Sequence, residues 1–167
     1  MRRSAIIRGN HRYELFRTWD VDGKVACFVM LNPSTADAEQ DDPTVRKCVG
    51  FAKRWGCGGV RIVNLFSIRS PSPSAIRLSD SPVGPRCDEH LLDAASNSDI
   101  AVAAWGNHGG YHARDRGVLD MLRREGVAVQ CLGVTTKGFP RHPLYVSYAV
   151  TLDLYRCFRS ENYSRLD

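Results

Sequence analysis

An uninterrupted apolar run from Val25 to Leu31 constrains the fold of this chain more than any other segment. Its residues do not alternate with polar ones, which is typical of a strand buried on both faces of a parallel or mixed sheet. A chain of 167 residues can hold a core for such a strand, because a domain of this length buries roughly 70% of its unfolded surface. Neither an internal repeat nor a linker-like segment is present, so residues 1–167 are expected to form a single domain.

The segments around this run predict the rest of the architecture. Two β-prone segments, 12–19 and 24–31, flank Asp20–Gly23, where glycine suits the positive φ of a hairpin turn. Further along, helices alternate with strands in the order helix 43–55, strand 60–65, helix 87–98, strand 100–105, helix 113–125, strand 127–132 and helix 147–158. This alternation predicts an α/β fold, a three-layer α/β/α sandwich with a central, mostly parallel sheet and an additional N-terminal β-hairpin.

The composition indicates which class of partner the protein binds and in which cellular compartment it works. The formal net charge is +5 and most cations are arginines, whose planar guanidinium suits phosphate, so the charge leans toward a nucleic-acid partner. The six cysteines are scattered without a CxxC pair, which favours reduced, buried thiols. No segment approaches the ~20 apolar residues of a membrane span, and polar residues follow the basic N-terminus before a secretory signal could form. A cytoplasmic protein without membrane contact is therefore expected.

Three polar side chains follow or end predicted strands. In open α/β sheets, ligands bind outside the carboxyl ends of the strands, so we expect a functional site there. Asn32 follows the first core strand, Asn64 interrupts an apolar strand, and His142 lies in a loop that two prolines stiffen. Structural explanations also exist for each residue. Asn32 before a proline is typical of an Asx turn, the amide of Asn64 can pair with backbone, and a lone loop histidine is often ordinary surface.

Signals for a metal or cofactor are weak. His108 and His112 are four residues apart, a metal-binding spacing on a helix, but two glycines between them disfavour a helix and no third ligand is evident. The sequence lacks GxGxxG, a phosphate-binding loop ending in Gly-Lys-Ser/Thr, GxSxG, HExxH and the zinc deaminase signature. We therefore expect no metal and no cofactor.

Several motifs together resemble known families. Phe28–Asp37, which contains LNPSTAD, resembles a family of bacterial and phage domains, as do Asp41–Thr44, Val63–Phe66, Val102–Gly106 and Arg141–Leu144. The order of the motifs is also similar to that of the uracil-DNA glycosylase superfamily. Those enzymes place Asn-Pro or Asp-Pro after the first core strand, an Asn at the end of the next strand, a Trp-Gly-like segment, and a late His-Pro loop.

The second resemblance implies a role for each motif. Asn32 would hold the hydrolytic water, Asn64 would read an extruded base, and His142 would stabilise charge on the departing base. Asp37 or Asp41 could instead orient the water, although a solvated loop or helix capping explains either carboxylate equally well. The aromatic residues expected beside the base are Phe66 and Trp105. The residues expected to contact phosphates, for which a solvated Ser/Pro loop is the alternative, are Ser34, Thr35, Arg69, Ser70, Ser72, Ser74 and Arg141.

The resulting prediction is a DNA glycosylase that hydrolyses the N-glycosidic bond of a flipped, modified or damaged base, with phage DNA as one source of such bases. Met30-Leu31 stands where the glycosylases usually have glycine, so the excised base need not be uracil. The expected partner is DNA and the expected state is a monomer. Two other functions stay open: a non-catalytic nucleic-acid or nucleotide-binding module, and a hydrolase of free nucleosides or nucleotides.

Overall fold

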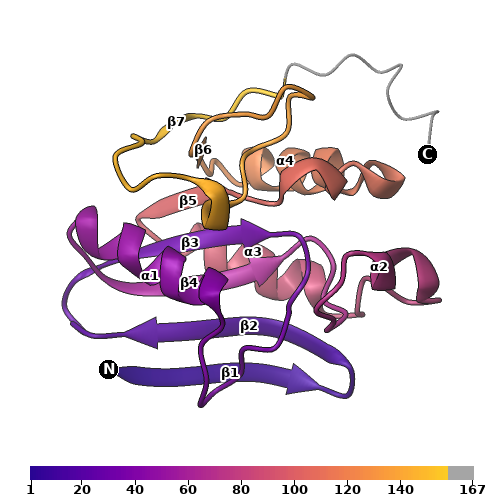
Figure 1. The fold of residues 1–167 in the computed structure, drawn as a ribbon, viewed down its shortest axis with the longest axis horizontal. Coiled ribbons are helices and arrows are strands. Elements are labelled where there is room, and N and C mark those ends of the chain that lie inside the picture. Colours follow the sequence, from indigo (N-terminus) through magenta and orange to yellow (C-terminus); the bar gives the residue numbers. More distant parts are fainter. Residues whose placement is uncertain (158–167) are drawn as a thin grey trace.

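The computed structural model describes residues 1–157 and contains a seven-stranded sheet with the order β1-β2-β4-β3-β5-β6-β7 (Figure 1). The strands are β1 (Arg2–Arg8), β2 (His11–Thr18), β3 (Lys24–Met30), β4 (Cys57–Asn64), β5 (Ile100–Ala103), β6 (Val129–Cys131) and β7 (Asp153–Leu154). The helices are α1 (Pro43–Arg54), α2 (Ser74–Leu78), α3 (Cys87–Ser96) and α4 (Arg114–Arg124). Short 3₁₀ turns span Gly106–His108, Tyr111–Ala113 and Pro143–Tyr145.

The sheet is parallel at its centre and antiparallel at its edges. β3 pairs in parallel with β4 and β5, and β5 pairs in parallel with β6. β2 pairs antiparallel with β1 and β4, and β7 pairs antiparallel with β6. Residues 26–30 of β3 are buried, which confirms that the apolar run forms an interior strand. The fold is therefore mixed α/β, and the predicted mostly parallel sheet is limited to the four central strands.

The predicted hairpin across residues 20–23 is wrong, because β4 lies between β2 and β3. The backbone N–H groups of Trp19 and Asp20 both donate to the carbonyl of Gly58 at the start of β4 (2.8 and 2.9 Å). A Cβ atom on Gly23 would lie 2.7 Å from the Cα of Gly58, so glycine allows the two segments to cross. β2 instead forms a hairpin with β1, whose largely exposed residues gave no apolar signal in the sequence.

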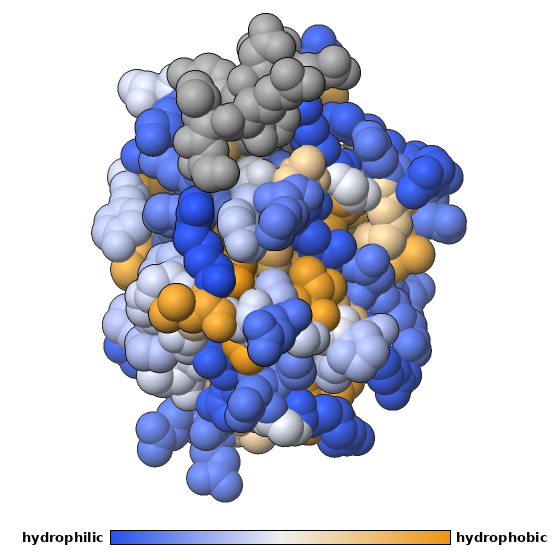
Figure 2. Space-filling model, turned by 90° about the vertical axis from the view of Figure 1, so that its right-hand side faces the viewer, coloured by the Kyte–Doolittle hydropathy of each residue, from blue (hydrophilic) through white to orange (hydrophobic). Residues whose placement is uncertain are grey.

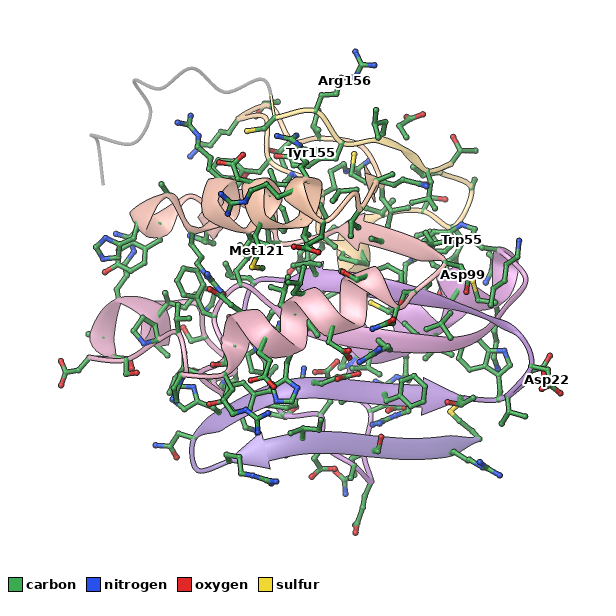
Figure 3. The ribbon with its side chains drawn as sticks, turned by 180° about the vertical axis from the view of Figure 1, so that it is seen from behind. Asp22, Trp55, Asp99, Met121, Tyr155 and Arg156 are labelled. Carbon is green, nitrogen blue, oxygen red and sulfur yellow. The ribbon has the colours of Figure 1, made fainter. Side chains whose placement is uncertain are left out.

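Helices cover both faces of the sheet. Successive strand residues point to opposite faces, so Phe28 packs in the cluster that contains Phe51 of α1, whereas Val29 packs in the cluster that contains Leu91 of α3 and Leu119 of α4. Figure 1 shows α1 on one side of the sheet, and the reverse view in Figure 3 shows α3 and α4 on the other. The predicted helices 43–55, 87–98 and 113–125 are confirmed as α1, α3 and α4, with ends that differ by a few residues.

The chain after residue 146 is not helical in the part that the structure describes, so the predicted helix 147–158 is wrong there, and residue 158 lies outside that part. Apolar residues at every second position pack in the cluster that contains Phe51 of α1, and this spacing does not form one face of a helix: Val146, Tyr148, Val150 and Leu152. A turn in which the N–H of Val150 donates to the carbonyl of Ser147 interrupts the segment (3.2 Å). The sequence also gave no signal for α2, which buried Ile76 anchors within a Ser/Pro-rich loop. Among residues 1–157, no helix is long and apolar enough to span a membrane.

Candidate functional site

A cavity of about 580 Å³ lies where β3, β4 and β5 end. Figure 2 looks onto this end of the molecule, where hydrophobic side chains are visible among hydrophilic ones near the middle of the face. The lining comes from the loops after these strands, the first turn of α1 and the loop before β7. It includes seven residues that the sequence predicted: Asn32, Ser34, Asn64, Ser70, Trp105, Arg141 and His142. It also includes residues that the sequence did not single out for a site, among them Arg12, Asp42, Thr44 and Tyr145.

Asn64 is the last residue of β4 and is only 2% exposed. Its Oδ1 atom is buried and has no hydrogen-bond partner, so neighbouring backbone does not satisfy this oxygen. A buried amide oxygen without a donor costs about 1–3 kcal/mol. Because Asn64 lines the cavity, an N–H group of a ligand is the natural partner for this oxygen.

Asn32 follows β3 and links two loops of the site. Its Nδ2 atom donates to the carbonyl of Ser70 (3.1 Å) and to that of Pro33 (3.3 Å). The backbone N–H of Ser70 also donates to the carbonyl of Pro33 (2.8 Å). Because the amide nitrogen is used by the loops, the group that Asn32 can offer to a ligand or a water is its Oδ1 acceptor.

His142 caps the short 3₁₀ turn at Pro143–Tyr145. Its Nδ1 atom accepts a hydrogen bond from the backbone N–H of Leu144 (3.3 Å), which leaves the ring hydrogen of the neutral tautomer on Nε2. Burial lowers the pKa of His142, and the nearby negative charge of Asp42 partly opposes this change. At neutral pH the side chain is therefore an uncharged Nε2–H donor in the cavity lining.

Asp42 brings a carboxylate to the cavity. The sequence indicated only that it caps α1, and its Oδ1 does accept from the backbone N–H of Val45 (2.8 Å). The structure adds that Asp42 lines the cavity and that its charge raises the pKa of both Arg12 and His142. Helix capping and a place in the cavity are thus compatible, because a carboxylate has two oxygens.

Arg12, in β2, contributes a cation that is only 2% exposed. Its Nη1 atom donates to the carbonyl of Ala36 (2.8 Å), while its Nε atom is buried without a partner. Desolvation lowers the pKa of Arg12 to about 10, and Asp42 partly opposes this change, so the guanidinium is charged at neutral pH. The sequence gave no signal for this residue because a single arginine in a strand is normally a surface residue.

Three residues predicted for the chemistry or for base stacking do not line the cavity. Asp37 Oδ1 accepts from the backbone N–H groups of Glu39 and Gln40 (2.8 and 2.9 Å), and these bonds lower its pKa. The carboxylate of Asp41 forms an ion pair with the buried guanidinium of Arg17 (2.7 Å). Phe66 is buried in the core cluster on the α3 and α4 side. Asp37 and Asp41 therefore stabilise the loop before α1, and Phe66 is a core residue.

Four of the predicted phosphate-contacting residues also lie outside the lining: Thr35, Arg69, Ser72 and Ser74. The hydroxyl groups of Ser72 and Ser74 are 2.8 Å apart at the start of α2. Their neighbours Ser70, Pro71 and Pro73 do line the cavity, so the serines lie beside the site on an exposed loop. Arg69 is close enough to Arg12 to lower its pKa.

Two aromatic residues line the cavity, one buried and one exposed. Trp105 is 1% exposed, packs edge-on against Tyr155 (5.8 Å between ring centroids), and has an Nε1–H without a partner. Tyr145 is 78% exposed, and its ring centroid lies 5.7 Å from that of His142. Tyr145 is thus the aromatic surface that a planar ligand entering the cavity can reach.

The structure brings one of the two histidines that are four residues apart in the sequence to the cavity. His108 is part of the lining and His112 is not. His112 adopts a left-handed backbone conformation (φ 51°) in the turn before α4, so the two residues do not share a helical face. No group of three or more His, Cys, Asp or Glu side chains in residues 1–157 could hold a metal ion.

Comparison with known protein families identifies a family for this chain. A family model described as "Protein of unknown function (DUF1643)" matches residues 12–144. The chain belongs to the DUF1643 family. The region shared with DUF1643 contains the whole cavity lining except Tyr145, and it leaves out β1 and β7. No curated protein and no solved structure matches the chain significantly.

Proposed function

We propose that this chain is a DNA glycosylase that removes a modified or damaged base from DNA. The observation that carries the proposal is the meeting of three distant polar groups in one cavity: the unpaired Oδ1 of Asn64, the Oδ1 of Asn32 and the Nε2–H of His142. A buried acceptor that nothing in the protein satisfies favours a ligand with a matching N–H donor. Nucleobases present such donors on their edges.

A flipped base would be held by its edge and by its face. Asn64 would accept from an N–H group on the edge of the base. Tyr145 would stack on the face of the base, which is the role that the sequence assigned to Phe66. Trp105 would close the inner side of the cavity. Extrusion of a base costs a few kcal/mol, which these contacts would offset.

Hydrolysis of the N-glycosidic bond needs a water and a donor to the leaving base. As the bond between the sugar C1′ and the base nitrogen breaks, its electron pair goes to the base and the sugar gains oxocarbenium character. The Nε2–H of His142 would donate to the base and stabilise this charge. The water would attack C1′ while it donates to Asn32 Oδ1 and to Asp42, and the carboxylate would accept its proton.

The surface around the cavity is suited to a DNA backbone. Arg141 lines the cavity, and its Nη2 atom donates to the carbonyl of Tyr145 (3.3 Å), which fixes the guanidinium at the rim. Ser34 and Ser70 lie on the same lining. The net charge of +5 adds a general attraction for phosphates.

The proposal extends to a three-layer, uracil-DNA glycosylase-like architecture and to a cytoplasmic monomer that acts on phage DNA as a defence.

The test is a base-release assay on DNA duplexes and single strands that carry a panel of modified bases, followed by alkaline cleavage at abasic sites. We expect strand breaks with at least one substrate, and their loss in both Asn32→Ala and His142→Ala. His112→Ala is the matched control, since this exposed histidine lies outside the lining. Binding without breaks on every substrate contradicts the glycosylase and favours a binding module. Base release from nucleosides or nucleotides alone contradicts it in favour of a nucleoside hydrolase.

A further inference from the structure

Arg12 is a buried cation that lacks an anionic partner of its own. It is 2% exposed, and the one hydrogen bond of its side chain to the residues that the structure describes runs from Nη1 to the carbonyl of Ala36. Within residues 1–157, no carboxylate lies within ion-pair distance of it. The nearby Asp42 raises its pKa but uses one oxygen to cap α1. Buried charges are normally paired because an unpaired one is costly to desolvate, so the partner of Arg12 is to be sought in the cavity that it lines.

A β-bulge turns Arg12 toward this cavity. In the β1–β2 ladder Ile6 pairs with Glu14 and Ile7 pairs with Arg12, so Tyr13 is skipped. Strict alternation from Leu15, which packs on the α1 side, would put Arg12 on the α3 side. The extra residue reverses this, because it places two consecutive side chains on the α3 side and returns Arg12 to the α1 side. Bulges that re-aim a side chain are over-represented next to active sites.

The two side chains on the α3 side confirm this effect of the bulge. The ring of Tyr13 stacks on His90 of α3, with 5.1 Å between the centroids. The carboxylate of Glu14 pairs with Arg61 (2.6 Å), which also pairs with Asp93 of α3 (2.7 Å). Arg12 is therefore held in the cavity by the geometry of its strand.

The unpaired groups of Arg12 and Asn64 complement each other in type. Arg12 Nε is a donor without an acceptor, and Asn64 Oδ1 is an acceptor without a donor. Both residues line the same cavity, and they come from β2 and β4, which are neighbours in the sheet. A ring that offers an N–H group to Asn64 and an oxygen group to Arg12 would satisfy both.

The charge around Arg12 favours a planar monoanion. Arg12 and Arg141 are the arginines of the lining, whereas nearby Arg69 lies outside it and nearby Arg17 is paired with Asp41. The carboxylate of Asp42 in the same lining would repel a dianionic phosphate more strongly than a monoanion. A carboxylate carries one charge, and its two oxygens match two N–H groups of a guanidinium. We propose that Arg12 determines specificity by binding an acidic substituent of the carboxylate type on the ring that occupies the cavity. This inference rests on the proposed function, since it assigns the class of base that the site accepts.

The direct test compares two free pyrimidines of nearly the same shape, 5-carboxyuracil and uracil-5-carboxamide, in which the amide replaces one charged acceptor oxygen by an uncharged NH2 donor. Calorimetric titration of the wild-type protein should show at least about tenfold tighter binding of the carboxylate, equivalent to 1.4 kcal/mol. Arg12→Met should remove this preference, and Arg69→Met, which changes a neighbouring arginine outside the lining, should retain it. Arg12→Lys keeps the charge without the bidentate geometry, so it should retain part of the preference and serves if Arg12→Met does not fold.

Three results would overturn the inference: equal affinity of the wild type for both pyrimidines, equal loss of the preference in the Arg12 and Arg69 variants, and inorganic phosphate that binds more tightly than the carboxylate. The base-release assay separates this inference from the proposed function. If the preference for the carboxylate depends on Arg12 but no base is released from DNA, the proposed glycosylase activity is contradicted and the acidic subsite is supported. If the protein released uncharged bases at a rate that Arg12→Met does not change, the glycosylase activity would stand and the acidic subsite would be contradicted.

Discussion

At the end of the sheet where β3 and β4 begin, an indole and a backbone N–H group have acceptors within the protein. The indole Nε1–H of Trp19 donates to the carbonyl of Cys57 (2.8 Å). The backbone N–H of Val25 donates to Asp99 Oδ2 (2.8 Å), and Figure 3 labels Asp99 at this end of the sheet. Thr18 Oγ1, in contrast, has no partner. This end is closed by packing and hydrogen bonds.

At the opposite end, the same kinds of group lack partners. The indole Nε1–H of Trp105 has no acceptor, Asn64 Oδ1 has no donor, and Arg12 Nε has no acceptor. All three residues line the cavity. One fold thus satisfies an indole at one end of its sheet and leaves another unsatisfied at the other. The difference teaches that unpaired groups gathered in one cavity point to ligand binding more strongly than residue type does.

The largest effect is expected when the end of the sheet that holds the cavity loses the Nε2–H donor of His142. His142→Ala should lower the rate of base release by about 10²–10³-fold, because it removes a hydrogen bond to the leaving base. His142→Gln can still donate, so it should retain part of the rate. Single-turnover measurements on the best substrate check this order. Equal rates for the wild type and His142→Ala would show that the histidine is only a cap of its turn.

Substitutions at the end where β3 and β4 begin should change the stability of the protein rather than its activity. A Cβ atom on Gly58 would lie 2.3 Å from the carbonyl oxygen of Asp20, so Gly58→Ala forces the two crossing segments apart. Such overpacking costs about 1–3 kcal/mol of the free energy of unfolding. Urea denaturation measures this loss, and ligand binding per folded molecule should be unchanged. Gly117→Ala on α4 is the control, since an added Cβ there meets nothing within 4 Å.

The same substitution should have opposite effects at the two ends. Asn64→Leu removes an unpaired buried oxygen, so it should raise the free energy of unfolding by about 1 kcal/mol while it abolishes ligand binding. Asn97→Leu removes an Nδ2 group that donates to the carbonyl and the carboxylate of Asp93 (3.0 and 2.9 Å), so it should lower stability by about 0.5 kcal/mol. Thermal melts of both variants test the comparison. Loss of stability in Asn64→Leu would contradict it.

The smallest effect concerns pH. Burial lowers the pKa of His142, so between its folded value and its ordinary value of 6.5 the unfolded chain binds a proton that the folded chain does not. Stability should therefore fall as the pH drops below 6.5, and His142→Asn, which can still cap the turn, should lose less. Melting temperatures between pH 7.5 and 5.5 give the comparison. An equal pH dependence of the two proteins would show that His142 does not contribute.

The central strands and the helices α1, α3 and α4 could be read from the sequence, but β1, α2, β7 and the order of the strands could not. The apolar run of β3 and the helical spacing in α1, α3 and α4 are local patterns, and the structure confirms them. The insertion of β4 between β2 and β3 depends on contacts between distant segments, above all the crossing at Gly23 and Gly58. No local pattern encodes that crossing.

The candidate site shows the same division. Asn32, Asn64 and His142 were found because the carboxyl ends of parallel strands meet at one edge of a sheet. Arg12 was missed because a bulge sets its direction, and bulges have no clear sequence signature. Phe66 was misplaced because β4 ends at Asn64, and beyond a strand end the alternation of side chains no longer holds.

The strand order also has a consequence for folding during synthesis on the ribosome. β2 emerges early, yet the strand that completes its hydrogen bonding ends only at Asn64, after α1 has been synthesised. Until then β2 keeps one free edge, which is a surface to which other nascent chains or chaperones can add a strand. Arg12 and Asn64 come together when β4 docks against β2, so the cavity is absent from any chain whose translation stops before that strand.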